Sequence, residues 1–418
     1  MGVRKRQPRT PQAIGCGILV LALAACGSTL TGDGPRATDP TTTSATTVAS
    51  GQTTPGVDDQ RVLFGQSAAL SGPAQELGLE MRLGINAAFH EVNSNGGVAG
   101  RRLELISLDD TYEPELAIAN TLQLIEDEGV FALIGEVGTP TSRSATPVAA
   151  EADVPFVAPF TGAAFLRSES WTNIVNLRAS YAQETEEMVA RLTQDLEIER
   201  IAIMYQDDSF GRTGLQGAQA ALERRDMQPV SVGIYPRNTT AIKTGLIDLT
   251  LGNPDAVIVV GAYQPVAALI AWSRHIGFDP IFITISFVGS NALARELGPD
   301  GKGVFVTQVV PFPTDTSIPV VASYNDALAA YAPDASPSFV SLEGYLSGRL
   351  AIIGLEACGP EPTRACFLEG LLDGGVMDIG GFPLTFGPGD NQGSDRVFLT
   401  FINSEGEYEP AEEIKRIW

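Results

Sequence analysis

Residues 62–97 read VLFGQSAALSGPAQELGLEMRLGINAAFHEVNSNGG and contain the unit from which the fold is predicted. The apolar run at 62–68 predicts a buried strand, because a strand of a parallel sheet is covered on both faces and carries few polar residues. A helical pattern follows over 80–92, and Asn95-Gly96-Gly97 supplies residues that tolerate a positive φ where that helix should end. The stretch therefore predicts one strand–helix unit of an α/β protein.

The same alternation continues along the chain and predicts its architecture. Further buried strands are expected at 103–108, 131–134, 155–158, 201–205, 256–260, 281–285 and 303–309, with helices at 114–128, 214–225 and 265–275. The pattern pauses at 173–180, a new helix starts near Tyr181, and a second series begins at Arg200. We therefore expect an α/β fold of two doubly wound parallel-sheet lobes joined by a multi-segment hinge. Lobe 1 should comprise 61–179 plus about 310–396, and lobe 2 should comprise 180–309 plus about 397–418.

The first sixty residues predict export and attachment to a membrane. Four basic residues precede an apolar segment at 13–25 that is too short to span a membrane, as in a signal peptide. The segment Leu23-Ala24-Ala25-Cys26 resembles a bacterial lipobox, which implies that residues 1–25 are removed and Cys26 is lipidated. Residues 26–60 are rich in Thr, Ser, Gly and Pro and predict a flexible tether. We expect the protein on the outer face of the cytoplasmic membrane; the alternative is an ordinary signal peptide with an incidental cysteine.

Charge and cysteine content restrict the partners and the compartment. The formal net charge is −23, and loss of the basic signal peptide would make the mature chain more negative still. An acidic body is repelled by nucleic acid and by anionic headgroups, so membrane contact should come from the lipid anchor only. Cys358 and Cys366 lie in a turn-rich segment, and an oxidising compartment predicts a disulfide between them rather than two free thiols.

Polar residues and aromatic residues follow several of the expected strands. In open α/β sheets ligands bind beyond the carboxyl ends of the strands, so these loops are the first candidates for a binding site. Thr139 follows the strand at 131–134 and is expected to cap the next helix, with a ligand anion as the second possibility. The candidate loops of the first half are Leu70-Ser71-Gly72-Pro73, residues 135–141 and Pro159-Phe160-Thr161-Gly162, and those of the second half are residues 205–211, Gly261-Ala262-Tyr263-Gln264 and Ser286-Phe287-Val288-Gly289.

An ordered set of motifs resembles one known family. The motifs are Leu70-Ser71-Gly72-Pro73, residues 95–100, residues 109–114, residues 205–211, Gly261-Ala262-Tyr263 and residues 386–391, and they cover nearly all of the chain after the tether. They resemble type I periplasmic binding proteins, the family that includes the leucine/isoleucine/valine-binding protein. The resemblance implies an extracytoplasmic solute-binding protein of an ABC uptake transporter that captures its ligand by hinge closure, works with a permease and needs no cofactor. We expect a monomer.

The resemblance also implies a set of ligand-binding residues. Residues matching Thr139, Phe160 and Gly162 hold the polar head of the ligand in that family, and its aromatic lids match Phe210 and Tyr263. The full set of candidates is Ser71, Leu77, Tyr112, Thr139, Phe160, Thr161, Gly162, Phe210, Tyr263, Ser286 and Phe287. No residue is expected to bind a metal.

Three positions depart from the family pattern. Ser286 stands where branched-chain amino acid binders carry an acidic residue for the ligand ammonium, and Leu77 stands where they carry an aromatic side chain. The lobe 1 disulfide of the family would fall near Tyr112 and Gly138, so that bridge is missing. The first departure weakens the case for an α-amino acid ligand, because an unneutralised ammonium is costly to bury. Glu113 or Asp208 is a possible substitute, and amides, urea-like solutes and aromatic acids also fit.

Two other classes of function fit the sequence less well. An enzyme is disfavoured because the only histidines, His90 and His275, fall inside helical patterns, and no nucleophile elbow, phosphate loop or zinc motif occurs. The acidic pairs at 109–110 and 207–208 are expected to be caps and turn formers. A ligand-binding sensor subunit of a signalling system is the alternative to transport, and a neighbouring gene for a kinase or a permease would distinguish the two.

Overall fold

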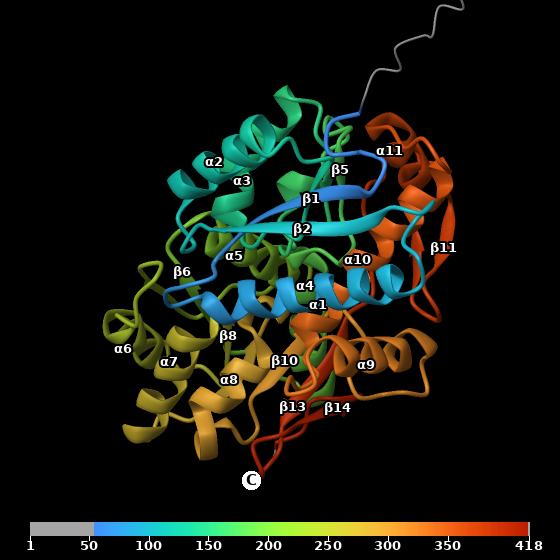
Figure 1. Ribbon diagram of the computed structural model, residues 1–418. Coiled ribbons are helices and arrows are strands. Elements are labelled where there is room, and N and C mark those ends of the chain that lie inside the picture. The colour runs from blue at the N-terminus through green and yellow to red at the C-terminus, as the bar shows by residue number, and fades with distance from the viewer. Residues whose placement is uncertain (1–53, 417–418) are drawn as a thin grey trace, which may run out of the picture. The chain divides into compact units, whose positions relative to one another are not determined.

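The structure is a computed structural model, and it describes residues 54–416. The predicted signal peptide, Cys26 and the tether up to residue 53 lie outside the described residues. Lobe 1 is built on a five-stranded parallel sheet in the order β2-β1-β3-β4-β5, and β1 and β2 lie next to each other in Figure 1. Its strands are β1 (Arg61–Ala68), β2 (Arg102–Asp109), β3 (Ala132–Ile134), β4 (Phe156–Val157) and β5 (Ile174–Val175).

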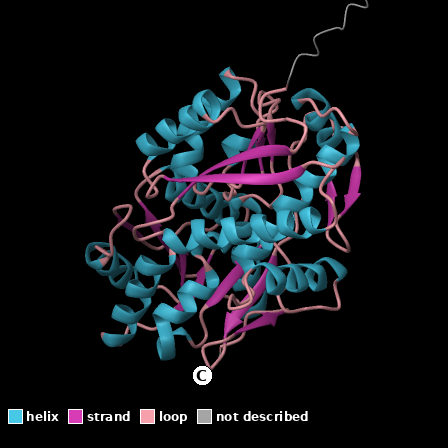
Figure 2. Ribbon diagram, viewed as in Figure 1, coloured by secondary structure: helices cyan, strands magenta, loops and turns pink. Residues whose placement is uncertain are grey.

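Helices cover the sheet of lobe 1, as Figure 2 shows. Two of them, α1 and α10, approach so closely that a Cβ on Gly84 would lie 1.8 Å from the carbonyl oxygen of Ser341. Glycine is therefore required at this crossing, where no larger residue fits. The elements of lobe 1 are α1 (Gln75–Ser94), α2 (Pro114–Leu122), the π-helical turn η1 (Gln123–Asp127), α3 (Thr139–Glu151), η2 (Ala164–Arg167), α9 (Pro319–Tyr331), α10 (Phe339–Cys358), α11 (Arg364–Leu372) and the hairpin of β11 (Val376–Asp378) and β12 (Pro383–Thr385).

Lobe 2 is built on a seven-stranded sheet in the order β14-β13-β10-β9-β8-β6-β7. Its strands are β6 (Ile201–Gln206), β7 (Val232–Tyr235), β8 (Ala256–Val260), β9 (Ile281–Thr284), β10 (Phe305–Gln308), β13 (Phe398–Ile402) and β14 (Tyr408–Ala411). Its helices are α4 (Tyr181–Leu196), α5 (Ser209–Glu223), α6 (Lys243–Gly252), α7 (Tyr263–His275), η3 (Ser286–Val288), α8 (Ser290–Leu297) and η4 (Gly298–Gly301). The sheet is not wholly parallel as predicted, because β13 runs antiparallel to β10 and to β14.

Three segments connect the two sheets. The first follows β5, the second joins β10 to α9, and the third joins β12 to β13. The first and third run side by side: the N–H of Asn176 donates to the carbonyl of Asn391, and the N–H of Gly393 donates to the carbonyl of Asn176, both at 2.8 Å. A paired crossing of this kind restricts the relative motion of the lobes to bending about few backbone positions.

The expected elements are present with shifted ends. The helix predicted at 80–92 begins five residues earlier, at Gln75, and β5 and β7 were not predicted as strands. Residues 54–60 were expected to belong to the tether, and this is wrong. Val57 forms a bridge with Val62, and the N–H of Leu63 donates to the carbonyl of Gly56 at 2.8 Å. Gly56 has a φ of +74°, and a Cβ there would lie 2.1 Å from the backbone nitrogen of Phe131, so the glycine lets this segment pack on the sheet.

The predicted disulfide between Cys358 and Cys366 is present and connects the end of α10 to the start of α11. His90 packs against the ring of Tyr331 and His275 against that of Trp272, both on helices as expected. Within residues 54–416, no helix is both long and apolar enough to cross a bilayer.

Candidate functional site

Thr139 and Thr161 form the polar centre of the lobe 1 site. Their hydroxyl oxygens lie 2.6 Å apart, and both side chains are fully buried. Thr139 is the first residue of α3, but its hydroxyl does not cap that helix; the N-cap position is Gly138, with a φ of 106°. The capping prediction is therefore wrong. The hydroxyl is turned instead to the loop after β4, so two strand-end loops meet there.

Phe160 and Gly162 hold this loop close to its neighbours. The N–H of Phe160 donates to the carbonyl of Glu136 at 2.7 Å, and the N–H of Tyr181 donates to the carbonyl of Gly162 at 2.8 Å. A Cβ on Gly162 would lie 2.6 Å from the backbone nitrogen of Tyr181, so only glycine allows α4 to start against this loop.

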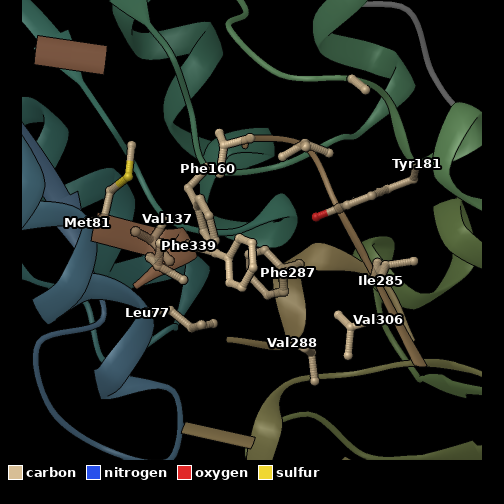
Figure 3. Packing of buried hydrophobic residues seen from close by; sticks show 14 of the residues in the cluster. Leu77, Met81, Val137, Phe160, Tyr181, Ile285, Phe287, Val288, Val306 and Phe339 are labelled. Atoms are coloured by element: carbon tan, nitrogen blue, oxygen red, sulfur yellow. The ribbon is translucent and has the colours of Figure 1, made fainter. Parts of the chain in front are cut away.

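Aromatic rings from both lobes meet at one place, which we call the lobe interface (Tyr112 and Phe160 of lobe 1; Tyr181, Phe210 and Phe287 of lobe 2). The centroid of the Phe287 ring lies 4.6 Å from that of Phe210, 5.3 Å from that of Phe160 and 6.1 Å from that of Tyr112. Tyr181 packs edge-on against Phe210 at 5.5 Å. Figure 3 shows Phe287 between Phe160 and Val288 with the Tyr181 hydroxyl pointing toward this pair of phenylalanines. The lobes are therefore in contact through packed aromatic rings.

Leu77 and Tyr263 lie at a second contact between the lobes. Leu77, on α1, is fully buried, and a Cβ on Gly289 of lobe 2 would lie 2.6 Å from its Cδ2 atom. Tyr263, the first residue of α7, is also buried and lies beside Gly289. A small cavity of about 10 Å³ adjoins this contact and is lined by Leu77, Glu80, Gly289, Ala292, Arg295 and Val340 among others.

A buried charged cluster lies next to the rings and centres on Arg178 in the first crossing segment. The guanidinium donates to Glu184 at 3.2 Å and to the hydroxyl of Ser286, and its Nη1 atom lies 3.4 Å from Glu343. Its Cζ atom also lies 5.0 Å from the centroid of the Phe160 ring. Burial lowers the pKa of Arg178, but the charges of Glu343 and Glu184 outweigh it and leave this pKa raised. Burial raises the pKa of Glu343 to about 7. This cluster was not predicted from the sequence, because its members come from distant segments.

Ser286 is placed in this cluster. Its N–H donates to one oxygen of Glu184 at 2.8 Å and its hydroxyl to the other at 3.0 Å. The hydroxyl of Thr307 also donates to Glu184, at 2.7 Å. A carboxylate is therefore present beside residue 286 after all, because Glu184 lies there. Both of its oxygens already accept hydrogen bonds from Ser286 and Thr307.

The remaining predicted residues lie at the edges of the site. Ser71 is in an exposed turn, and its hydroxyl donates to Asp109 at 2.5 Å. Tyr112 is buried with a φ of +62°, and a Cβ on Gly138 would lie 2.2 Å from its ring. The two positions that match the missing disulfide are therefore in contact, with the tyrosine ring filling the space.

Neither suggested substitute for the missing acidic residue is free. Glu113 accepts hydrogen bonds from Arg237 at 2.5 Å and Asn238 at 2.8 Å, which links the lobes at the rim of the site. Asp208 caps α5 by accepting from the N–H groups of Phe210 and Gly211, as expected for a strand-end aspartate.

Several of the buried polar atoms without a hydrogen-bond partner among residues 54–416 lie in segments that follow strands. They include both carboxyl oxygens of Glu136, Nε and Nη1 of Arg178 and the hydroxyls of Ser142, Tyr181 and Ser209. Burial, and then the charge of Asp110, raises the pKa of Glu136 well above its usual range. Burial raises the pKa of Tyr181 to about 12. Unpartnered buried polar atoms are rare and costly, so they make this region the first candidate for a binding site.

The fold agrees with the comparisons to known proteins. The sequence model of a family described as "Periplasmic binding protein" matches residues 62–407. The Leu/Ile/Val-binding protein of Escherichia coli (strain K12) is 21% identical over 272 residues, which are 65% of this chain and 73% of that protein. BraC3 of Rhizobium johnstonii, named a Leu/Ile/Val-binding protein, is 24% identical over 78% of this chain and 87% of its own length. The crystal structure of a possible leucine/isoleucine/valine-binding protein from Rhodopirellula baltica SH 1 shares 41% identity and superposes with a TM-score of 0.82, covering 86% of this chain and 98% of that one.

Proposed function

Because the chain belongs to the periplasmic binding protein family, we propose that it is an extracytoplasmic lipoprotein that delivers a small polar or amino-acid-like solute to an ABC uptake transporter. Substrate binding and the type I two-lobed fold follow from the family. The lipid anchor at Cys26, the permease partner and the monomeric state are the finer parts of the proposal. They rest on the sequence of the first 26 residues and on the family to which the chain belongs.

The observation that carries the proposal is the meeting of two strand-end surfaces. Lobe 1 contributes the hydroxyl pair of Thr139 and Thr161 together with the ring of Phe160. Lobe 2 contributes Phe210 and Phe287, and Tyr181, whose hydroxyl is without a hydrogen-bond partner, packs on Phe210. Hydroxyls fix the orientation of a polar head while rings bury an apolar body, which is the usual composition of a small-molecule site.

The proposed ligand contacts extend over both lobes. We assign Ser71, Leu77, Tyr112, Thr139, Phe160, Thr161, Gly162, Phe210, Tyr263, Ser286 and Phe287 to the site. The assignment of Ser71 rests on the sequence alone, since its hydroxyl is engaged with Asp109 in an exposed turn.

Hinge closure is the proposed mechanism. The lobes, 61–179 plus about 310–396 and 180–309 plus about 397–418, part by bending at the three crossing segments and close over the ligand. Two ion pairs connect them in the described conformation: Arg237 with Glu113 and Arg295 with Glu76, each at 2.5 Å. A ligand that binds the closed form more tightly shifts the population toward it.

A thermal-shift screen of metabolites on the purified full chain tests the proposal, because a ligand of the folded state raises the melting temperature. Thr139→Ala and Tyr263→Ala should each weaken the binding of whichever solute is found by about tenfold, the loss of one buried polar contact or one lid ring. Circular dichroism should show both variants folded. If both bound the solute as tightly as the parent, the assignment of the site would be wrong.

A further inference from the structure

A buried ion triad of Arg178, Glu184 and Glu343 connects the two lobes at the hinge. Arg178 lies in the first crossing segment, Glu343 lies on α10 of lobe 1, and Glu184 lies on α4 of lobe 2. The guanidinium reaches both carboxyls, with Nη1 3.4 Å from Glu343 and Nη2 3.2 Å from Glu184. The three side chains are at most 4% exposed. Because the two carboxyls belong to different lobes, bending at the hinge changes the distance between them.

The two carboxyls of the triad have very different contacts. Glu184 accepts from the N–H and the hydroxyl of Ser286, at 2.8 and 3.0 Å, and from the hydroxyl of Thr307 at 2.7 Å. Glu343 has the ion pair with Arg178, whose 3.4 Å is longer than a charge-assisted hydrogen bond. Hydrogen-bond donors favour the ionised form of a carboxyl, and burial favours its protonated form. Glu343 is therefore the member of the triad that is expected to exchange a proton.

Charges from three neighbouring segments act on Glu343. Burial is the largest effect and raises the pKa of Glu343 to about 7. Arg178 lowers this pKa, Glu184 raises it, and Arg167 of η2 lowers it. Further titratable groups on the elements packed against α10 are engaged elsewhere: Glu80 with Ser338, Tyr324 with Ser341, Glu91 with Tyr345 and Arg349, Arg295 with Glu76, and Arg364 with the carbonyls of Val130 and Phe131. The protonation of Glu343 therefore depends on its burial and on how near lobe 2 brings Glu184.

We infer, building on the proposed hinge closure, that Glu343 takes up a proton when the lobes close and releases it when they open, so that closure depends on pH. Opening moves Glu184 away with lobe 2 and admits water to Glu343. Removing a neighbouring carboxylate and removing burial both favour the ionised form, so the two effects act in the same direction. Arg178 stays beside Glu343 as its countercharge in the open form.

The pH window of this dependence is set by the two forms of Glu343. In the closed form its pKa is about 7, and in an open form that fully exposes the carboxyl the pKa approaches the ordinary value of 4.5. The contribution of Glu343 to closure is therefore fully present below about pH 4.5 and is lost as the pH rises through about 7. With full exposure on opening, the closed-to-open ratio is about tenfold larger at about pH 6 than at about pH 8.

Small-angle X-ray scattering of the ligand-free full chain between about pH 6 and about pH 8 tests the inference. The radius of gyration of the parent should increase with pH as the open population grows. Glu343→Gln has nearly the shape of the protonated side chain and cannot ionise, so it should keep at the higher pH the radius that the parent has at the lower one. Asp110→Asn is the matched control, because burial also raises the pKa of Asp110 to about 7, but its hydrogen bonds with Ser67 and Tyr112 lie within lobe 1. This control should show the pH dependence of the parent.

A radius of gyration independent of pH in the parent, or the same pH dependence in Glu343→Gln, would overturn the inference. Loss of the dependence in Asp110→Asn alone would assign the proton to Asp110 and would overturn it as well. Calorimetry of the parent needs no variant: in buffers of different ionisation enthalpy, a solute found by screening should bind with uptake of up to about one proton near neutral pH. Binding without proton exchange would overturn the inference and leave the proposed function intact. If no solute in a metabolite library bound, the proposed function would fail, and the scattering series would still decide the inference.

Discussion

Gly289→Ala should weaken the closed conformation without a matching loss of fold stability. Gly289 belongs to lobe 2, and a Cβ at this position would lie 2.6 Å from the Cδ2 atom of Leu77 in lobe 1. The clash exists only while the lobes are in contact. The positive φ of +78° adds backbone strain, but that strain is the same in the open and closed forms and cancels in their equilibrium.

The size of the effect follows from the packing. Leu77 is fully buried and has little room to move, so one extra methyl group costs about 1–3 kcal/mol, the usual range for overpacking. That cost lowers the closed-to-open ratio roughly 5- to 150-fold. Small-angle X-ray scattering of the ligand-free protein should show a larger radius of gyration for the variant than for the parent. The affinity for any solute found by screening should fall in proportion to the population of the closed form.

Two further variants separate the clash from the strain. Gly277→Ala has the same strain, with a φ of +75°, but a Cβ there meets no atom within 4 Å. It should lose stability without opening the lobes. Leu77→Ala combined with Gly289→Ala should restore closure. An unchanged scattering curve for Gly289→Ala, or the same change for Gly277→Ala, would refute the reasoning.

Three other perturbations have definite expected outcomes. Glu113→Gln should lower the closed-to-open ratio about threefold and make this ratio less dependent on salt, because the partly exposed ion pair with Arg237 is worth about 0.5–1 kcal/mol. Scattering at low and high ionic strength measures the ratio. Equal salt dependence in the variant and the parent would contradict the prediction. Burial raises the pKa of Asp110 to about 7, so folding favours the protonated form of this side chain. The stability that Asp110 contributes is therefore fully present below about pH 4 and is lost as the pH rises through about 7. Asp110→Asn should flatten that part of the melting-temperature profile, and an unaltered profile would show that Asp110 does not titrate in this window. Replacing Cys358 and Cys366 by serine should lower the free energy of unfolding by about 2–3 kcal/mol, the entropy of closing a short loop. Denaturant unfolding measures this loss. No loss of stability would show that α10 and α11 hold the loop without the disulfide.

The fold could be predicted from the sequence wherever a strand is long and apolar. Residues 256–260 were assigned as a strand with the observed ends, because five consecutive apolar residues fit a doubly covered parallel strand. The strand at Val232–Tyr235 was missed because its residues alternate between buried and exposed at the edge of the sheet. The segment at 54–60 was misassigned because its composition is that of a linker, while its packing depends on one glycine against Phe131.

The candidate site could be predicted in outline for a different reason. Thr139, Phe160 and Phe287 lie in the segments that follow β3, β4 and β9, and the loops after the neighbouring strands β3 and β4 lie at the same edge of one sheet. The contact between Thr139 and Thr161 could not be predicted, since a threonine at a helix start reads as a cap.

Arg178 shows most clearly why part of the site escapes sequence reasoning. It lies in a crossing segment with no motif around it, and its partners Glu184, Ser286 and Glu343 lie 6, 108 and 165 positions away in the chain. The replacement at Ser286 looked like the loss of a carboxylate, whereas in the fold it admits Glu184 to the same place and engages it with a buried guanidinium. An acidic residue at 286 would add a third carboxylate beside Glu184 and Glu343 and would be costly to ionise. The serine, Glu184 and the buried arginine are therefore one feature, in which the small side chain at 286 leaves room for the ion pair.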